Sequence, residues 1–198
     1  MKNLFILAGG KSKRLGFDKL NLKIGNQRVI QIIDRSIGSL FDKKFIVVKN
    51  GYVEFEGFEV IKDRIEIDAP VAGVLTSLMV SRTNKNFIIA CDMPFAKKEL
   101  VEYMLGFNGY DAIVPYYNGY FEPLFCVYSK AFLEKALDFI NKGEFSLSAI
   151  LQSSNIKKIE INEILRFDPY LESFKNINTQ SDLEAANERF RRVLSNQV

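Results

Sequence analysis

The order of apolar segments constrains the fold of this chain more than any other feature of its sequence. Short, continuously apolar runs alternate with longer segments in which apolar residues recur at helical spacing. Continuously apolar strands are typical of a parallel sheet that helices cover on both faces. The pattern therefore predicts an α/β fold, a three-layer α/β/α sandwich around a mostly parallel, twisted sheet.

The expected elements can be placed by residue number. Strands are expected at 4–8, 45–48, 59–61, 87–90, 112–114, 121–127 and 157–161. Helices are expected at 29–40, 74–80, 100–105, 131–140, 146–151 and 180–194. Thr179 and Asp182 form a suitable cap for the last helix. Ser181 and Glu184 form a competing capping box.

The 198 residues contain no linker-like stretch and no internal repeat, so we expect a single domain, 1–198. The net charge is +3 and basic residues are interspersed with acidic ones, which argues against a nucleic-acid partner. No apolar run approaches the roughly 18 residues of a membrane helix. The apolar start is also too short for a signal peptide. We therefore expect a cytoplasmic protein without a membrane partner.

Two residue types narrow the chemistry. The chain has no histidine, which excludes histidine-based triads, histidine-ligated zinc and histidine acid–base catalysis. Cys91 and Cys126 match no metal-ligand spacing. They are expected to be reduced, buried thiols.

A glycine-rich, basic segment directly follows the first expected strand. It runs from Leu7 to Lys19, contains Gly9, Gly10 and Gly16, and carries several Lys and Arg side chains. Glycine N–H groups can close around phosphate oxygens, and basic side chains supply compensating charge. The spacing is neither that of a Walker A loop nor the Gly-x-Gly-x-x-Gly of dinucleotide folds. We interpret the segment as a phosphate-binding loop; the alternative is a solvated glycine turn.

An acidic residue follows the fourth expected strand. Asp92 lies in Cys91-Asp92-Met93-Pro94, at the strand end where open α/β sheets bind ligands. Magnesium prefers one or two carboxylates together with phosphate oxygens and water, so Asp92 is the candidate Mg²⁺ ligand. The alternative is a turn residue stabilised by its own backbone.

Further candidates lie on the same edge of the predicted sheet. Asp63 follows the third strand and Asp68 precedes the next helix, although each alone is more typical of a loop than of a ligand site. Ala69, Ala72 and Gly73 are small enough for a flat base to approach the backbone. The phosphate loop, the acid after the fourth strand and the lack of histidine favour phosphoryl or nucleotidyl transfer, which depends on positioning and charge neutralisation.

These motifs resemble those of a known family. The first is Leu7-Ala8-Gly9-Gly10-x-Ser12-x-Arg14-x-Gly16-x-Asp18-Lys19, which resembles the signature of nucleotidyltransferases with a glycosyltransferase-A-like, Rossmann-type fold. Its Gly-x-Asp-Lys ending is similar to that of the molybdenum cofactor guanylyltransferases, the MobA family. Later segments resemble this family in the same order: Val60-Ile61-Lys62-Asp63 with Ala69-Pro70-Val71-Ala72-Gly73, Cys91-Asp92-Met93-Pro94, Glu122-Pro123-Leu124-x-x-x-Tyr128, and Asn176-Ile177-Asn178-Thr179-x-x-Asp182-Leu183.

The resemblance implies an enzyme that uses Mg²⁺, with Mn²⁺ as an alternative cation. GTP would donate GMP to the terminal phosphate of molybdopterin, which gives the guanine dinucleotide cofactor and pyrophosphate. Attack on the α-phosphorus would be in line, and an acceptor phosphate that is already ionised needs no general base. A molybdoenzyme or its chaperone is a further implied partner.

The resemblance also implies roles for the matched residues. Nucleotide binding is implied for Leu7, Ala8, Gly9, Gly10, Lys19, Asn50, Asp63 and Asp92. Catalytic roles are implied for Arg14, Lys19 and Asp92, of which Asp92 would also hold the metal. Asp63 would contact the guanine side, and Lys49 beside Asn50 belongs to the same segment. Molybdopterin binding is implied for Asn176 and Asn178.

Departures from the family pattern leave the nucleotide and the acceptor open. Ala69 replaces a glycine, Gln27-Arg28-Val29 replaces Lys-Pro-Leu, and Gln180 replaces a proline. One alternative is a cytidylyltransferase, or another nucleotidyltransferase that acts on a small phosphorylated acceptor. The other is a non-catalytic carrier of nucleotide or molybdopterin.

Remaining patterns are interpreted as packing. The apolar stripes of the helices at 29–40 and 183–194 are assigned to the core. The aromatic cluster of Tyr116, Tyr117, Tyr120 and Phe121 is assigned to the packing of a hairpin. A wall of the pterin pocket is the alternative for that cluster.

Overall fold

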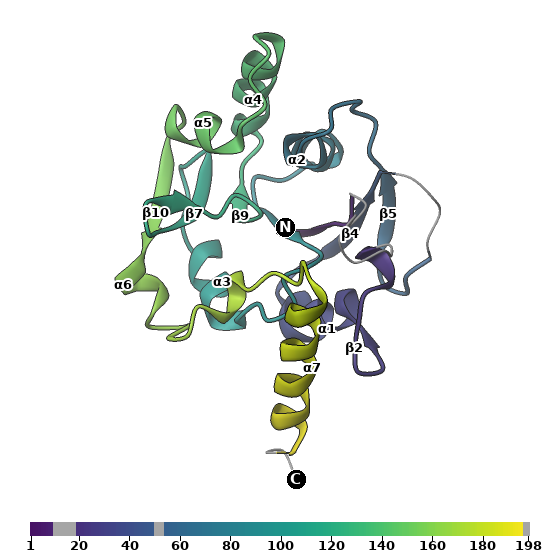
Figure 1. Cartoon of the computed structure of the whole chain (residues 1–198). Coiled ribbons are helices and arrows are strands. Elements are labelled where there is room, and N and C mark those ends of the chain that lie inside the picture. The colour runs from purple at the N-terminus through teal and green to yellow at the C-terminus, as the bar shows by residue number, and fades with distance from the viewer. Residues whose placement is uncertain (10–18, 50–53, 196–198) are drawn as a thin grey trace.

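The computed structural model describes residues 1–9, 19–49 and 54–195, with side chains described as far as Arg191 except that of Lys19. Within these residues, an eight-stranded sheet has the order β10-β7-β9-β6-β1-β4-β5, and β8 pairs with β7 outside that path (Figure 1). The strands of this sheet are β1 (Asn3–Leu7), β4 (Lys43–Val48), β5 (Glu59–Lys62), β6 (Asn86–Ala90), β7 (Ala112–Tyr117), β8 (Tyr120–Phe121), β9 (Phe125–Tyr128) and β10 (Ile156–Glu160). A separate hairpin joins β2 (Lys23–Ile24) to β3 (Gln27–Arg28).

Helices surround the sheet. The α-helices are α1 (Val29–Ile37), α2 (Pro70–Val80), α3 (Lys98–Leu105), α4 (Ala131–Asn141), α5 (Leu147–Gln152), α6 (Ile161–Ile164) and α7 (Gln180–Ser195). Short 3₁₀ helices are η1 (Lys19–Asn21), η2 (Gly38–Leu40) and η3 (Glu172–Phe174). In Figure 1, α7 (yellow) extends away from the rest of the molecule towards the C-terminus.

The sheet is mostly parallel, as predicted. β1 lies between β4 and β6 and runs parallel to both, β5 is parallel to β4, and β10 is parallel to β7. β9 reverses the direction, because it runs antiparallel to both β6 and β7. The parallel half of the sheet therefore gathers the carboxyl ends of β1, β4, β5 and β6 at one edge.

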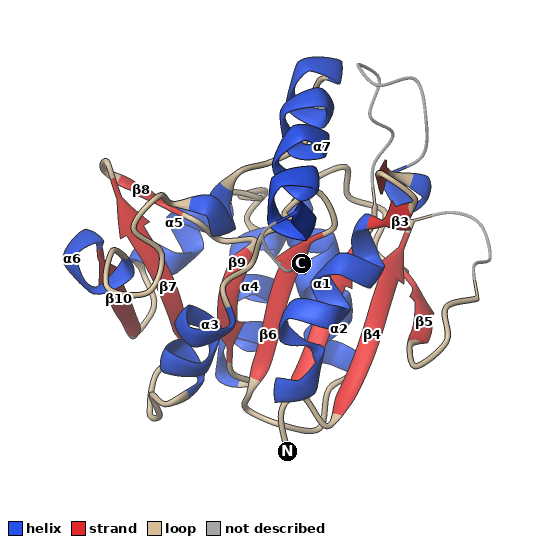
Figure 2. Ribbon diagram, turned by 90° about the horizontal axis from the view of Figure 1, so that it is seen from below, coloured by secondary structure: helices blue, strands red, loops and turns tan. Residues whose placement is uncertain are grey.

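Alternate residues of β1 enter two separate hydrophobic cores. Leu4 and Ile6 pack with the apolar faces of α1 and α3. Phe5 and Leu7 pack with α2, α4 and α5 on the opposite face. Figure 2 shows helices on both sides of the strands. The three-layer α/β/α architecture is thus confirmed, and its cause is a strand that is buried on both faces.

The predicted strand at 121–127 is wrong, because a turn at 122–124 divides it into β8 and β9. The N–H of Phe125 donates to the carbonyl of Glu122 (3.1 Å), which closes this turn. Pro123 has no N–H to give to a strand ladder, so it favours an interruption here. The turn directs Glu122 towards the edge of the sheet discussed below.

Helix ends also differ from the sequence-based boundaries. α1 ends at Ile37, and residues 38–40 continue as the 3₁₀ helix η2. α2 begins at Pro70 instead of 74, since proline fits the first position of a helix, where its missing N–H is not needed. The β2–β3 hairpin, α6 and η3 are too short for a periodic pattern to indicate.

The start of α7 confirms the predicted cap. The N–H of Asp182 donates to Oγ1 of Thr179 (3.2 Å), and Oδ2 of Asp182 accepts the N–H of Thr179 (2.8 Å). Glu184 of the competing box instead accepts a hydrogen bond from the side chain of Gln180 (3.2 Å). Ala186 is buried, and the helix docks on the core through its apolar face.

The packing predictions are confirmed for the two cysteines and for Tyr116 with Phe121, whereas Tyr117 stacks on Phe174 and Tyr120 is exposed. Cys91 and Cys126 are buried thiols and are not part of a disulfide. Tyr116 faces Phe121 across the β7–β8 hairpin with ring centroids 5.0 Å apart, as expected for hairpin packing. Within the described ranges, no helix is both long and apolar enough to cross a membrane.

Candidate active site

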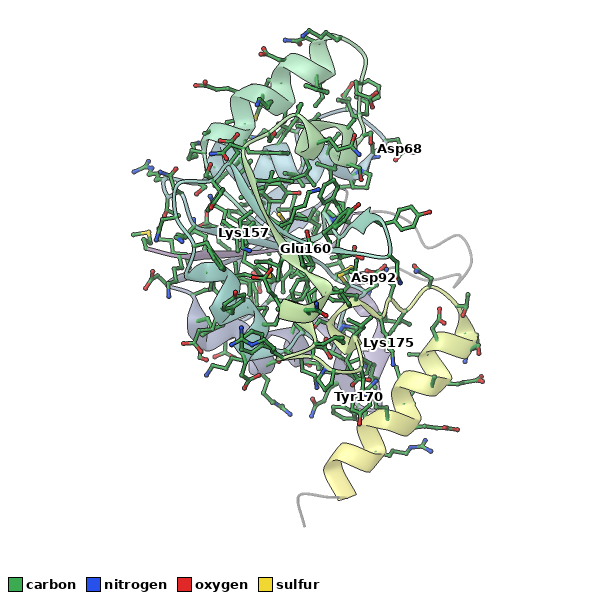
Figure 3. All side chains as sticks on the ribbon, turned by 90° about the vertical axis from the view of Figure 1, so that its left-hand side faces the viewer. Asp68, Asp92, Lys157, Glu160, Tyr170 and Lys175 are labelled. Carbon is green, nitrogen blue, oxygen red and sulfur yellow. The ribbon has the colours of Figure 1, made fainter. Side chains whose placement is uncertain are left out.

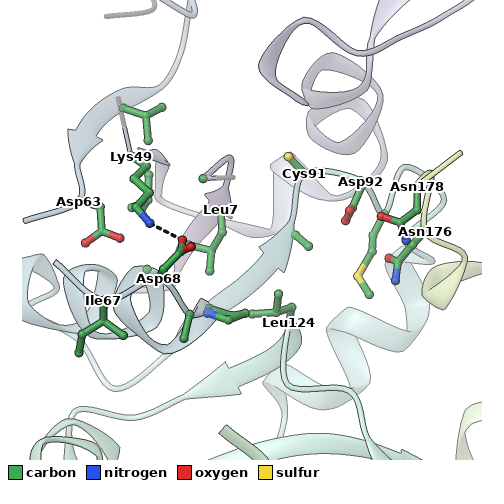
Figure 4. A pocket seen from close by; sticks show the side chains of 18 of the residues that line it. Leu7, Lys49, Asp63, Ile67, Asp68, Cys91, Asp92, Leu124, Asn176 and Asn178 are labelled. Atoms are coloured by element: carbon green, nitrogen blue, oxygen red, sulfur yellow. Dashed lines mark hydrogen bonds and ion pairs between the residues drawn. The ribbon is translucent and has the colours of Figure 1, made fainter. Parts of the chain in front are cut away.

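A cavity of about 360 Å³ opens at the edge where β1, β4, β5 and β6 end (Figure 4). Its walls are built by the residues that follow these strands, by the turn between β8 and β9, and by the segment that precedes α7. Open α/β sheets bind ligands at this kind of edge. The cavity brings together these predicted site residues: Leu7, Gly9, Asp63, Asp92, Asn176 and Asn178.

At the end of β1, Leu7 and Gly9 line the cavity, whereas the predicted site residue Ala8 does not. The carbonyl of Leu7 accepts the N–H of Cys91 (3.1 Å), so the end of β1 is tied to the turn that carries Asp92. The N–H of Ala8 donates to the carbonyl of Val47 (2.8 Å), and the Ala8 methyl group is buried in the core. A Cβ on Gly9 would be 3.7 Å from Cβ of Lys49, an ordinary contact. The space around Gly9 therefore does not by itself require a glycine at this position.

Of the three small residues after Asp68, Ala69 and Gly73 line the cavity as predicted and Ala72 does not. Gly73 lies on α2 against β1, and a Cβ there would be 3.1 Å from Cδ1 of Leu7. Its lack of a side chain serves the packing of Leu7. Ala72 is buried and does not line the cavity, whereas Ala69 does. A helix that begins at Pro70 turns neighbouring residues to different sides, which a linear motif cannot indicate.

Asp92 lies in the turn after β6 and is only 5% exposed. Its carbonyl accepts the N–H of Ile177 (2.9 Å). This bond holds Asn176 and Asn178 beside Asp92, although these residues are far apart in the sequence. The geometry joins the candidate metal ligand to the predicted molybdopterin side of the cavity.

Asp63 forms part of the opposite wall. Its Oδ1 accepts hydrogen bonds from Oγ1 of Thr76 (2.6 Å) and from the N–H of Ile65 (3.1 Å). Its own N–H donates to the carbonyl of Val48 (2.7 Å). These bonds fix the loop after β5 on α2 and on the end of β4.

Lys49 and Asp68 form an ion pair in the cavity wall, with 2.6 Å between Nζ and Oδ1 (Figure 4). Asp68 lies at the periphery of the molecule, apart from Asp92 (Figure 3). The sequence placed both residues on this edge but indicated no contact between them.

Glu122 is a cavity residue to which sequence reasoning gave no role. Its pKa is raised to about 7, mainly by burial, while a hydrogen bond from Tyr117 lowers it and the charge of Asp92 raises it. The Tyr117 hydroxyl donates to Oε2 of Glu122 (3.4 Å), and burial raises the pKa of Tyr117 to about 12. A perturbed carboxyl in a cavity is a candidate functional group. The signal in the sequence was the segment Glu122-Pro123-Leu124, which resembles a family motif but did not indicate a role for the glutamate.

Some predicted residues cannot be placed. Gly10, Arg14 and Asn50 lie outside the described residues. Lys19 begins η1, and its side chain is also outside them. Their roles therefore stay predictions.

The carboxyl groups that line the cavity determine whether it suits a divalent cation. Among the described residues, no group of three or more Asp, Glu and Cys side chains is arranged to hold a metal ion alone. The cavity does contain two carboxyl groups of low exposure, those of Asp92 and Glu122. This donor set fits Mg²⁺, which takes one or two carboxylates and completes its shell with phosphate oxygens and water.

Comparison with known proteins places this geometry in a family. The MobA-like NTP transferase domain matches residues 4–158. The chain belongs to the MobA-like NTP transferase family. A protein of Natranaerobius thermophilus named "Probable molybdenum cofactor guanylyltransferase" is 34% identical over 190 residues, which cover 91% of this chain and 92% of that protein. The molybdenum cofactor guanylyltransferase of Syntrophotalea carbinolica is 30% identical, covering 90% of this chain and 87% of that protein.

A solved structure is similar to this MobA-like chain over its whole length. The molybdopterin-guanine dinucleotide biosynthesis protein A of Archaeoglobus fulgidus has a TM-score of 0.80 at 25% identity, and the match covers 96% of this chain and 99% of that one. Most of the cavity lies within the matched MobA-like domain. Asn176 and Asn178 lie beyond residue 158, so the C-terminal segment completes the cavity from outside it.

Proposed function

We propose that this protein transfers GMP from GTP to the terminal phosphate of molybdopterin, forming the guanine dinucleotide cofactor and releasing pyrophosphate. One observation carries the proposal. A single cavity joins Leu7, Gly9 and Asp63 to Asp92, and the bond from Ile177 to Asp92 adds the Asn176–Asn178 segment. The names of the relatives support the same reaction.

The proposed transfer of GMP does not require a general base. An oxygen of the acceptor phosphate forms a bond to the α-phosphorus of GTP, and the bond from that phosphorus to the pyrophosphate oxygen breaks. The acceptor phosphate is already ionised near neutral pH, so no side chain has to remove a proton. A chain without histidine can therefore perform this transfer by positioning its substrates and stabilising charge.

Each side of the cavity has a distinct proposed task. Asp92 would hold Mg²⁺ or Mn²⁺, with Glu122 as the second carboxyl group in the same cavity. The bound cation would neutralise charge on the triphosphate. The backbone at Gly9 would lie against the nucleotide, and Asn176 and Asn178 would donate to the acceptor.

Residues outside the described ranges complete the proposal. Gly10 and Asn50 would contribute to the nucleotide site. Arg14 and Lys19 would offset charge on the transferring group and on the leaving pyrophosphate. These assignments rest on the signature motif that begins at Leu7.

The experiment that tests the reaction measures pyrophosphate release with Mg²⁺ and molybdopterin, comparing GTP, CTP, ATP and UTP. We expect release with GTP alone. Release only with CTP would replace the guanylyltransferase by a cytidylyltransferase with the same mechanism. Binding of GTP without release would favour a carrier of nucleotide or molybdopterin. We further propose that the reaction takes place in the cytoplasm and that a molybdoenzyme or its chaperone receives the product.

A further inference from the structure

The ion pair between Lys49 and Asp68 lies at one end of the cavity. Lys49 directly follows β4, and Asp68 precedes the first turn of α2. Nζ of Lys49 is 2.6 Å from Oδ1 of Asp68, and both residues line the cavity beside Leu7 (Figure 4). The pair therefore presents a positive and a negative group side by side to whatever enters at this end.

The pair is poorly suited to a structural role. The side chain of Asp68 is 100% exposed and that of Lys49 is 38% exposed. Exposed ion pairs contribute little to stability, because water screens them and both side chains lose freedom. The pair can consequently exchange its internal contact for contacts with a ligand at little cost.

The surroundings of the pair suit a planar ring. Ile67, Ala69 and Pro70 line the cavity next to Asp68 and provide apolar surface. A few polar groups at the edge of an apolar surface are typical of sites that fix the orientation of a small ligand. The phosphate end of a nucleotide would point away from this surface, towards Gly9 and Asp92.

The donor and the acceptor of the Lys49–Asp68 pair match the hydrogen-bonding edge of guanine. Guanine presents the O6 acceptor beside two donors, the N1–H and the 2-amino group. An ammonium group donates and a carboxylate accepts, so a Lys–Asp pair can satisfy all three positions. Adenine and cytosine carry an amino group where guanine has O6, and an acceptor where guanine has N1–H. They would place a donor against Lys49 and a lone pair against Asp68, which opposes their binding.

Asp63 is less suited to this task. Its Oδ1 already accepts two hydrogen bonds, from Thr76 and from the N–H of Ile65. These bonds hold the carboxyl group in the wall. The assignment of the guanine side to Asp63 therefore shifts to the neighbouring pair.

We propose that Lys49 and Asp68 read the guanine base of the nucleotide, Lys49 by donating to O6 and Asp68 by accepting from N1–H and the 2-amino group. This inference rests on the proposed function, since it concerns the base of the same nucleotide. It names the side chains that distinguish GTP from ATP and CTP.

The test measures nucleotide binding by isothermal titration calorimetry, with Mg²⁺ and without acceptor. The probes are GTP, CTP, ITP, which lacks the 2-amino group, and XTP, which has a carbonyl oxygen in its place. The wild-type protein should bind GTP more tightly than ITP or XTP. Asp68→Asn supplies an amide that donates to the xanthine oxygen, so the preference for GTP over XTP should fall by roughly 10- to 100-fold.

Two further variants test the role of Lys49 and provide a control. Lys49→Met should weaken GTP, ITP and XTP by similar factors, because all three carry the 6-oxo group. Glu66→Gln is the matched control, since Glu66 is an exposed carboxylate in the same loop and does not line the cavity. It should keep the preference order of the wild-type protein.

The outcomes separate this inference from the proposed function. If wild-type protein prefers GTP and Asp68→Asn keeps the same order of affinities, the pair does not read the base and guanylyl transfer still stands. If wild-type protein binds CTP more tightly than GTP, both the base reader and the guanylyltransferase assignment are wrong.

Discussion

The charge of Asp92 is the single-residue feature on which the proposed transfer depends most. Asp92→Asn keeps the volume of this buried side chain and removes its charge. We expect pyrophosphate release at saturating GTP and Mg²⁺ to fall roughly 100- to 1,000-fold, because an amide would not hold in place the cation that offsets charge on the transferring group. Circular dichroism and the urea midpoint should stay close to those of wild type. Turnover like that of the wild-type protein would remove Asp92 from the mechanism.

The raised pKa of Glu122 predicts that the stability of the protein depends on pH. Its pKa is raised from 4.5 to about 7 on folding, mainly by burial, so the folded state holds a proton that the unfolded state releases. The stabilisation is complete below pH 4.5 and is lost as the pH rises through 7. Without divalent cations, Glu122→Gln should match wild type near pH 4.5 and be more stable at pH 8 by roughly 2 to 3 kcal/mol.

Urea unfolding of both proteins at the two pH values measures this difference directly. Groups that titrate in both proteins contribute equally to the two unfolding free energies, so their contributions cancel in the comparison. A difference in unfolding free energy that stays constant between the two pH values would show that Glu122 titrates normally in the folded protein.

At the level of elements, α7 is attached to the body of the molecule by polar contacts as well as by its apolar face. Arg189 forms an ion pair with Glu172 of η3, whose side chain is 6% exposed, and lies 4.8 Å from the ring centroid of Phe95. Oδ1 of Asn187 accepts the N–H of Gly25 in the β2–β3 hairpin (2.6 Å). These contacts fix α7 relative to the segment that carries Asn176 and Asn178.

Removing the charge of Arg189 should therefore loosen this attachment. Arg189→Met leaves Glu172 buried with Lys175 as its one remaining cationic partner among the described side chains, so we expect a loss of about 1 to 3 kcal/mol in unfolding free energy. Arg191→Met is the matched control, because Arg191 lies on the exposed side of the same helix. Equal urea midpoints for the two variants would mean that the Glu172 pair adds no stability.

η3 itself is organised by a carboxyl group that is completely buried. The two oxygens of Asp168 accept the N–H groups of Glu172 (2.9 Å) and Ser173 (2.7 Å). Oγ of Ser173 in turn accepts the N–H of Lys97 (3.0 Å), close to the Asp92 turn. The C-terminal segment is thus held against the end of β6 by hydrogen bonds from two directions.

For the whole molecule, ligand binding and folding are linked because the cavity is assembled from both ends of the chain. A ligand that binds only the folded state at a hundredfold excess over its Kd adds about 2.7 kcal/mol of stability. For a domain of this size, that is a rise in Tm of roughly 5 to 10 °C. We expect this rise with GTP and Mg²⁺ in a thermal unfolding experiment, and a smaller one with CTP.

The same experiment distinguishes the cation from the nucleotide. In Asp92→Asn, GTP alone should still raise Tm, but the additional rise caused by Mg²⁺ should disappear. An Mg²⁺ effect of wild-type size in this variant would indicate that the cation is held elsewhere.

The sequence by itself determined the order and type of most elements and the position of several candidate residues. The spacing of apolar residues along the chain is a local property of the sequence. β1, β4, β6 and the longer helices could therefore be predicted from it. Residues that follow parallel strands meet at one edge, so Asp63 and Asp92 could be placed in the same cavity before the structure was known.

Only the tertiary structure decided which side chains act together. The reversed direction of β9, the position of Glu122 in the same cavity as Asp92, and the pairing of Lys49 with Asp68 depend on residues that are distant in sequence. The raised pKa of Glu122 has the same origin, since burial and the nearby charge of Asp92 arise only after folding. Desolvation and charge proximity are properties of the packed molecule, and no local pattern along the chain carries them.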